Sequence, residues 1–165
     1  MKRSPKKGSK AGSGEHFDER QLTGSDLQLL SDFGRRRSMF ERAIEESNII
    51  HHKHTCPACG FPTLDQRYDY DVCVICLWED GASEATPARI AAPNYTSLVQ
   101  DRINIAGLFA EFEQTYEIDA SLDNVIKSIK SFEERLDAGE VEIDREDFNR
   151  HLRNVLPTRE LERSS

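Results

Sequence analysis

The stretches "HTCPACGFPTL" (residues 54–64) and "CVIC" (residues 73–76) hold all the cysteines of this 165-residue chain. Each stretch carries one CxxC pair, and the four cysteines are Cys56, Cys59, Cys73 and Cys76. Two such pairs have the spacing of a tetrahedral metal site with four cysteine ligands, in which each CxxC turn directs two sulfurs at one ion. The pairs therefore predict a metal centre around which the chain folds, and zinc is the expected ion.

The segment between the two pairs has the residues of a tight turn followed by an extended strand. Gly60 follows the first pair directly and permits the left-handed backbone that such turns need. Further on, Tyr68, Tyr70 and Val72 alternate with polar residues, which is typical of a strand. We expect a hairpin here that returns the second pair to the first.

The residues around the cysteines also bear on three other interpretations. Disulfides are disfavoured because the N-terminus lacks the apolar region of a secretory signal. A thioredoxin-like nucleophile is disfavoured because Pro62 and its neighbouring turn residues stand where the required helix would begin. Iron in a rubredoxin-like electron-transfer site stays open, since its ligands and their spacing are nearly the same. A redox-labile or metal-free set of thiols is the remaining alternative.

Histidines gather beside the first pair in "HHKH" (residues 51–54). A closed set of four cysteines leaves no ligand position for His51, His52 or His54. We therefore expect these three side chains to be exposed beside a turn. The two isolated histidines, His16 and His151, are expected at the surface or on a helix face rather than among metal ligands.

Helical periodicity appears on both sides of the cysteine segment. The expected helices span residues 25–48, 97–114, 121–139 and 144–157. Ser25 is expected to cap the first helix, Asp119 or Ser121 the third, and Pro157 to end the last. The side chains expected to face inward are, helix by helix, Leu27, Leu30, Phe33, Phe40 and Ile44; Leu98, Ile105, Leu108, Phe109 and Phe112; Leu122, Val125, Ile126, Ile129, Phe132 and Leu136; and Phe148, Leu152 and Val155 or Leu156.

The predicted fold is therefore α+β, a small four-cysteine zinc-ribbon or knuckle β unit flanked by three to four α-helices. A unit of below about 70 residues buries too little surface to fold alone, so the metal is expected to supply folding free energy. The expected divisions are a disordered basic tail (1–20), an N-terminal helix (21–50), a zinc-binding domain (51–106) and a C-terminal helical extension (107–165).

Charge is spread unevenly along the chain. Residues 1–14 hold five cations and no acid, although the whole chain has a formal net charge of −8. The acidic body is expected to attract a basic protein partner and to repel a nucleic-acid backbone, so nucleic-acid binding would need the Lys-rich tail. No apolar run reaches the length of a membrane span, and we expect a soluble, cytoplasmic protein.

Motifs of catalysis are missing from the sequence. A nucleoside-deaminase zinc site needs a His-x-Glu and a Pro-Cys order, whereas this chain has Cys56-Pro57 and no His-x-Glu. There is no Gly-rich phosphate loop and no Gly-x-Ser-x-Gly elbow. We therefore expect a protein that is not an enzyme, with no catalytic residues.

Two charged stretches invite a functional interpretation. In Trp78-Glu79-Asp80, we expect the tryptophan to cover the metal site and one of the acids to form a salt bridge with Arg102. The run at residues 35–37 is all arginine, but consecutive positions on a helix fan apart and form no flat basic stripe. We expect a solvated helix face there, with Arg37 paired to Glu41.

Further motifs surround the two cysteine pairs in a fixed order. They are Cys56-Pro57-Ala58-Cys59-Gly60-Phe61, Thr63-Leu64, Tyr70-Asp71, Cys73, Cys76, Trp78-Glu79-Asp80, Asn94, Ser97-Leu98, Arg102 and Asn104. This order, over about residues 54–106, resembles the bacterial cysteine-rich CPCC family. The resemblance implies a zinc-binding domain of bacterial or phage origin with no established reaction. It also implies a link to toxin–immunity loci, near which some members are encoded.

The chain departs from the family at three positions. Ala58 stands where the family has an extra cysteine, so a metal here would be held by the four CxxC sulfurs alone. Asp101 replaces the usual alanine and Ile105 an aromatic residue. We expect a non-catalytic zinc-binding protein that acts by protein–protein interaction, with toxin immunity or regulation as the sharper hypothesis. Nucleic-acid binding and rubredoxin-like electron transfer are the alternatives.

Overall fold

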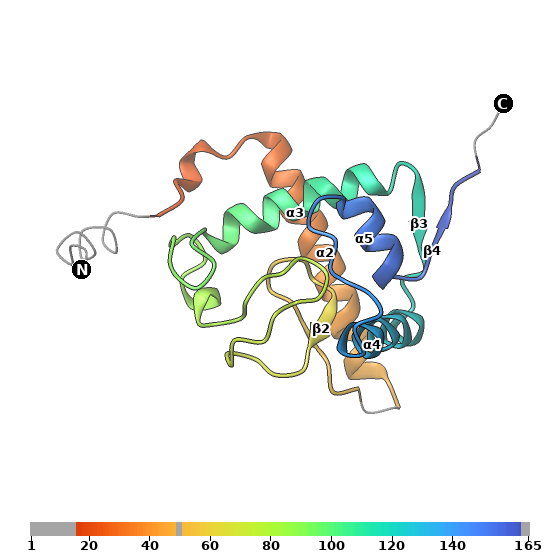
Figure 1. Cartoon of the computed structure of the whole chain (residues 1–165). Coiled ribbons are helices and arrows are strands. Elements are labelled where there is room, and N and C mark those ends of the chain that lie inside the picture. Colours follow the sequence, from red (N-terminus) through yellow and green to blue (C-terminus); the bar gives the residue numbers. More distant parts are fainter. Residues whose placement is uncertain (1–15, 49–50, 163–165) are drawn as a thin grey trace.

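Four α-helices surround a central region of loops and short strands in the computed structural model, which describes residues 16–48 and 51–162 (Figure 1). The helices are α2 (Gly24–Glu46), α3 (Leu98–Phe112), α4 (Leu122–Asp137) and α5 (Phe148–Val155), with short 3-10 turns η1 (Glu19–Gln21) and η2 (Ser83–Ala85). Strands β1 (His54–Thr55) and β2 (Pro62–Leu64) form one antiparallel pair, and β3 (Tyr116–Ile118) and β4 (Thr158–Glu160) form another. The predicted α+β class is confirmed.

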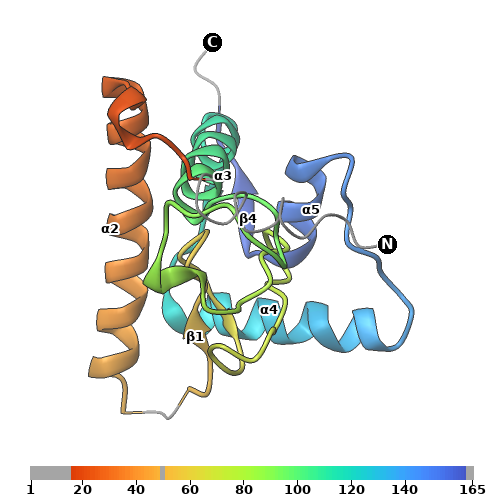
Figure 2. The same cartoon turned by 90° about the vertical axis from the view of Figure 1, so that its left-hand side faces the viewer.

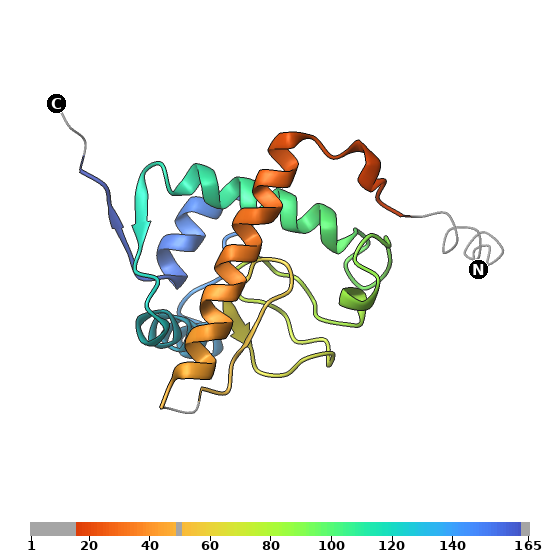
Figure 3. The ribbon, with the colours of Figure 1, turned by 180° about the vertical axis from the view of Figure 1, so that it is seen from behind.

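The central region of loops and short strands, residues 54–96, lies between the helices. Figure 2 shows α2 standing on one side of it and α5 on the other, with α4 crossing below. Seen from behind in Figure 3, α2 crosses α3, and the two helices pack against each other. The cysteine segment is therefore walled by helices from both ends of the chain.

The helix caps explain where the helices begin. Thr23, rather than the expected Ser25, caps α2: its side chain accepts from the backbone N–H of Asp26, whose carboxylate accepts from the N–H of Thr23. Ser121 caps α4 as expected, and Gly139 follows that helix in the left-handed conformation. Each of these helices is therefore started by a side chain that satisfies one of its free N–H groups.

The inward faces follow the sequence pattern with two exceptions. Leu27 on α2 and Leu108 on α3 are exposed, although both were expected to face inward. On α3 the buried stripe instead runs through Ile103 and Ala106 to Phe109, and α3 packs against α2. The periodicity therefore predicted the helices correctly, but it predicted only approximately which side chains of α3 are buried.

One aromatic chain joins the helices to the cysteine segment. The ring of Phe61 lies 5.3 Å from that of Phe40 on α2 and 5.2 Å from that of Phe109 on α3. Phe109 in turn meets Phe148, the first residue of α5, at 5.7 Å, edge to face. The buried cluster that contains Phe40, Phe61 and Phe109 also contains cysteines of both pairs. Three of the four cysteines therefore lie inside the hydrophobic core, and Cys76 packs against it.

The prediction of a strand at residues 68–72 is wrong. Tyr68 and Tyr70 adopt left-handed backbone conformations, both with φ of 62°, which a strand excludes. Val72 makes a single bridge, to Glu79. The alternation of tyrosines arises from exposed bends rather than from a pleated strand.

The expected divisions of the chain stay predictions. The basic tail lies largely in residues 1–15, outside the described residues, and the expected boundary at residue 106 falls inside α3. Within residues 16–48 and 51–162, no helix has the length and apolar character needed to cross a membrane.

Candidate metal centre

The four cysteine sulfurs come together as the sequence predicted. All four Sγ atoms lie within 4.8 Å of one another. The closest contacts join the two pairs, 3.7 Å between Cys56 and Cys76 and 3.7 Å between Cys59 and Cys73. A tetrahedral ion with metal–sulfur bonds of about 2.3 Å places its sulfurs about 3.8 Å apart, whereas a disulfide needs about 2.05 Å. The cluster fits a metal ion, and all four cysteines are free thiols.

The first knuckle is a tight turn closed by backbone hydrogen bonds. The N–H of Gly60 donates to the carbonyl of Cys56 at 2.9 Å, and the N–H of Cys56 donates to the carbonyl of Phe61 at 2.8 Å. The N–H of Ala58 points at the Cys56 sulfur, 3.4 Å away. This N–H donation lowers the energy of a thiolate at that position.

The second knuckle repeats the first with a different residue at the bend. The N–H of Leu77 donates to the carbonyl of Cys73 and the N–H of Cys73 to that of Trp78, both at 2.9 Å. Leu77 thus occupies the place of Gly60, and both are left-handed, with φ of 67° and 86°. A Cβ on Gly60 would stand 3.1 Å from the backbone nitrogen of Arg37, so that bend needs glycine for space as well as for φ.

Hydrogen bonds single out Cys73 as the sulfur that carries negative charge most readily. Its Sγ accepts from the hydroxyl of Thr63 at 3.0 Å and from the N–H groups of Ile75 and Cys76 at 3.4 and 3.5 Å. Burial acts to raise the pKa of this thiol, but hydrogen bonds from the other cysteines hold its pKa well below the usual value. Burial raises the pKa of Cys56 well above its usual value. A divalent ion would replace the protons that the cluster otherwise shares.

Two arginines from neighbouring helices bind the carbonyl groups of the first knuckle. Arg36 of α2 donates from Nε to the Cys59 carbonyl at 3.0 Å, and Arg102 of α3 donates from Nε to the Pro57 carbonyl at 2.8 Å. Four thiolates around a divalent ion carry a net charge of about −2. The two guanidinium groups therefore offset the charge of an occupied centre while fixing the knuckle to both helices.

The run at residues 35–37 is not the solvated face that the sequence suggested. Arg35 is exposed, but Arg36 lies with its guanidinium 4.4 Å from the ring centroid of Phe109. Arg37 is 16% exposed, and its Nε lies 3.2 Å from the Glu41 carboxylate, which confirms the expected (i, i+4) pair. Two of the three arginines are therefore part of the wall of the centre.

Glu84 is a site residue that sequence reasoning missed. Its carboxylate pairs with Arg37, with Arg67 at 2.6 Å and with Arg102 at 3.5 Å. Burial would raise its pKa, but the hydrogen bonds and charges of Arg37 and Arg67 lower that pKa to about 2. Glu84 lies in η2, a loop turn without periodicity, so no pattern points to it. It joins α2, α3 and the segment between the knuckles.

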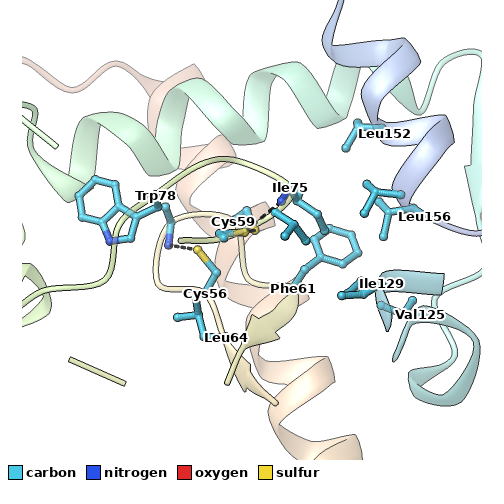
Figure 4. Packing of buried hydrophobic residues seen from close by; sticks show 14 of the residues in the cluster. Cys56, Cys59, Phe61, Leu64, Ile75, Trp78, Val125, Ile129, Leu152 and Leu156 are labelled. Carbon is cyan, nitrogen blue, oxygen red and sulfur yellow. Dashed lines mark hydrogen bonds between the residues drawn. The ribbon is translucent and has the colours of Figure 1, made fainter. Parts of the chain in front are cut away.

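The expected salt bridge between the Trp78-Glu79-Asp80 stretch and Arg102 is wrong. Asp80 is buried and pairs with Arg67 instead, at 2.8 Å, because the bend at residues 67–70 brings that guanidinium over it. The carboxylate partner of Arg102 is Glu84. Trp78 is buried beside the cluster, opposite Phe61 and Ile75 (Figure 4), and within the described residues its indole N–H has no hydrogen-bond partner.

The histidines stay outside the cluster, but not all are exposed. His52 and His54 are exposed, whereas His51 is largely buried with Nε2 3.4 Å from the Asp123 carboxylate. In the described part of the chain, the metal-capable group at this place contains the four cysteines alone. The exposed setting expected for His51 is therefore wrong, since its side chain is only 9% exposed and lies beside Asp123 in the first turn of α4.

His151 links α5 to the second knuckle. It is buried on the inner face of the helix, with Nε2 2.7 Å from the Val74 carbonyl oxygen. The other ring nitrogen accepts from the backbone N–H of Asp144 at 3.4 Å, so Nε2 carries the proton that Val74 accepts. The sequence placed this histidine on a helix face but did not indicate its partner.

The motifs that surround the cysteines hold the knuckles in place. The side chain of Asn94 both accepts from the N–H of Glu79 and donates to its carbonyl, at 2.9 Å each. Ser97 caps α3, from which Arg102 reaches the Pro57 carbonyl. The motifs that resemble the CPCC family therefore include residues that surround the candidate metal centre and hold its knuckles in place.

One comparison with known proteins found a match, and that match covers the cysteine segment. The family model described as Cysteine-rich CPCC matches residues 54–117, which is less than half of the chain. No curated protein and no solved structure matches the chain significantly. The resemblance to the cysteine-rich CPCC family is thereby confirmed for residues 54–117.

Proposed function

We propose that this chain is a zinc protein whose ion is structural and which acts by binding another protein. The observation that carries the first part is the set of four sulfurs within 4.8 Å of one another, three of them on buried cysteines of the core and the fourth, that of Cys76, on a partly buried residue packed against it. A catalytic zinc keeps one coordination position open for water or substrate, whereas this set supplies four protein ligands. The proposed ligands are Cys56, Cys59, Cys73 and Cys76.

The position of the cluster also favours a role in folding. Structural zinc contributes about 10–16 kcal/mol in small zinc-binding peptides, which matches or exceeds the roughly 5–15 kcal/mol stability of a typical domain. The two strands beside the cluster have two and three residues, so they contribute little without the ion. Removing the metal is therefore expected to unfold the region that α2, α3 and α5 share.

Metal analysis with chelation tests this proposal. We expect one zinc per chain in the purified protein and loss of near-ultraviolet circular dichroism when a strong chelator removes it. Cys73→Ser should abolish stoichiometric zinc, while the matched control His52→Ala should retain it, because His52 is exposed and outside the cluster. An unchanged fold after complete removal of zinc would refute the structural role.

The same experiment decides between zinc and iron. An iron centre with four thiolate ligands would give a red protein, and the sulfur geometry alone suits both ions. A colourless protein with stoichiometric zinc supports the proposal, while a red protein with iron supports rubredoxin-like electron transfer.

The second part of the proposal concerns the partner. The chain has a net charge of −8, which favours association with a basic protein and opposes contact with a nucleic-acid backbone. We propose a basic protein partner, in an immunity or regulatory role, within the cytoplasm, where four free thiols are kept reduced. The Lys-rich segment on which nucleic-acid binding would depend lies outside the described residues.

A further inference from the structure

Three tyrosines are exposed on the loops beside the second knuckle. The exposed fractions are 59% for Tyr68, 60% for Tyr70 and 78% for Tyr95, and Val72 next to them is also exposed. These loops, residues 66–72 and 91–96, are called here the tyrosine loops. In Figure 2 they face the viewer, and no described helix lies in front of them. Exposed aromatic rings that are grouped on a surface often mark the place where another molecule binds.

The tyrosine loops are held in place by hydrogen bonds rather than left free. Asp80 accepts from the N–H of Tyr70 with its carbonyl at 3.0 Å and from the N–H of Tyr68 with its carboxylate at 2.9 Å. The second loop is fixed by Asn94, whose side chain binds both backbone groups of Glu79. Both loops are thus tied to adjacent residues, 79 and 80, so the rings are presented from one rigid base.

The backbone at the tyrosines also points to a fixed presentation. Tyr68, Tyr70 and Tyr95 all have left-handed φ values, of 62°, 62° and 59°. Non-glycine residues adopt this conformation at an energetic cost, so the surrounding hydrogen bonds must hold it. Rings held before binding lose less entropy when a partner arrives.

The charge around the rings is negative. Residues 65–80 contain five acidic side chains and one cation, Arg67, and from outside the segment Lys53 pairs with Asp65 at 2.9 Å. That guanidinium is already occupied, because it pairs with Asp80 and with Glu84. It also lies 4.5 Å from the ring centroid of Tyr68, so one ring in this surface already carries an arginine. The exposed rings therefore combine with a local excess of acids, among them the exposed Asp69.

We propose that the tyrosine loops form a docking surface for an arginine-bearing segment of a basic protein. Arginine stacks on aromatic rings and pairs with carboxylates at the same time, which lysine does less well. Tyrosine and arginine are also the residues enriched at protein interfaces. Single-stranded nucleic acid could stack on the same rings, but its phosphates would face the acids of this surface. The inference rests on the proposed protein-binding function and names its surface and the chemistry of its partner.

Fluorescence anisotropy with short peptides tests the proposal on the full zinc-loaded chain. The probes are a labelled (Arg-Gly)5 peptide, a (Lys-Gly)5 peptide of equal charge and a single-stranded DNA of twelve nucleotides. We expect the arginine peptide to bind several-fold more tightly than the lysine peptide, and the DNA not to bind. Each ring–guanidinium contact at an exposed site contributes about 0.5–1 kcal/mol, or roughly two- to fivefold in affinity.

The variants are chosen to keep the backbone. Asparagine tolerates the left-handed conformation, so Tyr70→Asn with Tyr95→Asn removes two rings while retaining the bends. This double variant should weaken the arginine peptide roughly tenfold, with the zinc content and circular dichroism unchanged. Leu27→Ala, which removes an exposed side chain on α2, is the matched control and should bind as the parent does.

Three outcomes would overturn the docking surface. Equal binding of the two peptides, unaffected by the double variant, would mean that net charge alone attracts them. Tighter binding of the DNA would make the rings a nucleic-acid surface. A dimer seen by light scattering in the parent and lost in the double variant would make a second copy of the chain the occupant. In each case zinc content and unfolding by chelator are measured separately, so the structural-zinc proposal stands or fails on its own readout.

Discussion

Replacing Glu84 by glutamine should destabilise the protein more than any other single change of an acidic residue at its surface. The carboxylate joins three guanidinium groups, which come from α2, from α3 and from the segment between the knuckles. Glu84→Gln keeps the size of the side chain and removes its charge. Three arginines are then left close together with no central anion, although Arg67 keeps Asp80 and Arg37 keeps Glu41 as carboxylate partners.

The magnitude follows from the pKa of Glu84. Its pKa falls from a usual 4.5 to about 2 in the folded chain. At about 1.4 kcal/mol per pKa unit this corresponds to roughly 3 kcal/mol. The side chain is 25% exposed, so solvent screening reduces the expected cost of Glu84→Gln to about 1–2 kcal/mol. Because the folded pKa is depressed, this stabilisation is complete above pH 4.5 and is lost as the pH falls toward 2.

Urea unfolding at pH 7 with zinc present measures this cost. The control is Glu111→Gln, an exposed acid on α3, which should change the free energy of unfolding by less than about 0.5 kcal/mol. Arg37→Gln should cost less in the Glu84→Gln background than in the parent, because the two side chains pair directly. If Glu84→Gln matches the control and the double variant shows additivity, the reasoning about this network is wrong.

Three further changes have defined outcomes. Gly60→Ala should destabilise by about 1–3 kcal/mol and weaken zinc retention against a chelator, because φ is 86° there, whereas Gly24→Ala, with open space around it, should be neutral. His151→Leu should lower the melting temperature by an amount equivalent to about 1–3 kcal/mol, since it leaves the Val74 carbonyl without its donor; an unchanged melting temperature would contradict this. Asp101→Asn should stabilise by about 1 kcal/mol at pH 7.5, after screening, because burial raises the pKa of Asp101 to about 6. That gain should disappear below about pH 4, where the carboxyl is protonated in both the folded and the unfolded chain.

The sequence predicted the parts of this structure that depend on local spacing. The two CxxC pairs predicted which sulfurs come together, because each knuckle is formed within six residues. Gly60 indicated the bend of the first knuckle. The amphipathic segment at residues 121–139 predicted α4 and its Ser121 cap, because helix periodicity and capping act over a few residues. The repeat of the first knuckle's hydrogen bonds in the second was not predicted, since Leu77 replaces glycine there.

The parts that were missed depend on contacts across the sequence. Arg36 and Arg102 reach carbonyls of the first knuckle over separations of 23 and 45 residues, and periodicity carries no information on such pairs. The alternation of Tyr68, Tyr70 and Val72 has the period of a strand, but hydrogen bonds to Asp80 bend the backbone instead. Tertiary contacts therefore determine the partners of these arginines, and they also explain why residues 68–72 do not form a strand.

The hydrogen bond between His151 and Val74 can form only late in the synthesis of the chain. The two residues are 77 positions apart, and ribosomes add about 5–20 residues per second. The second knuckle therefore emerges roughly 4–15 seconds before α5 can cover it. During that interval Ile75 faces water and the free thiols face whatever oxidants are present. Early capture of zinc would shield the sulfurs while the rest of the protein is still being made.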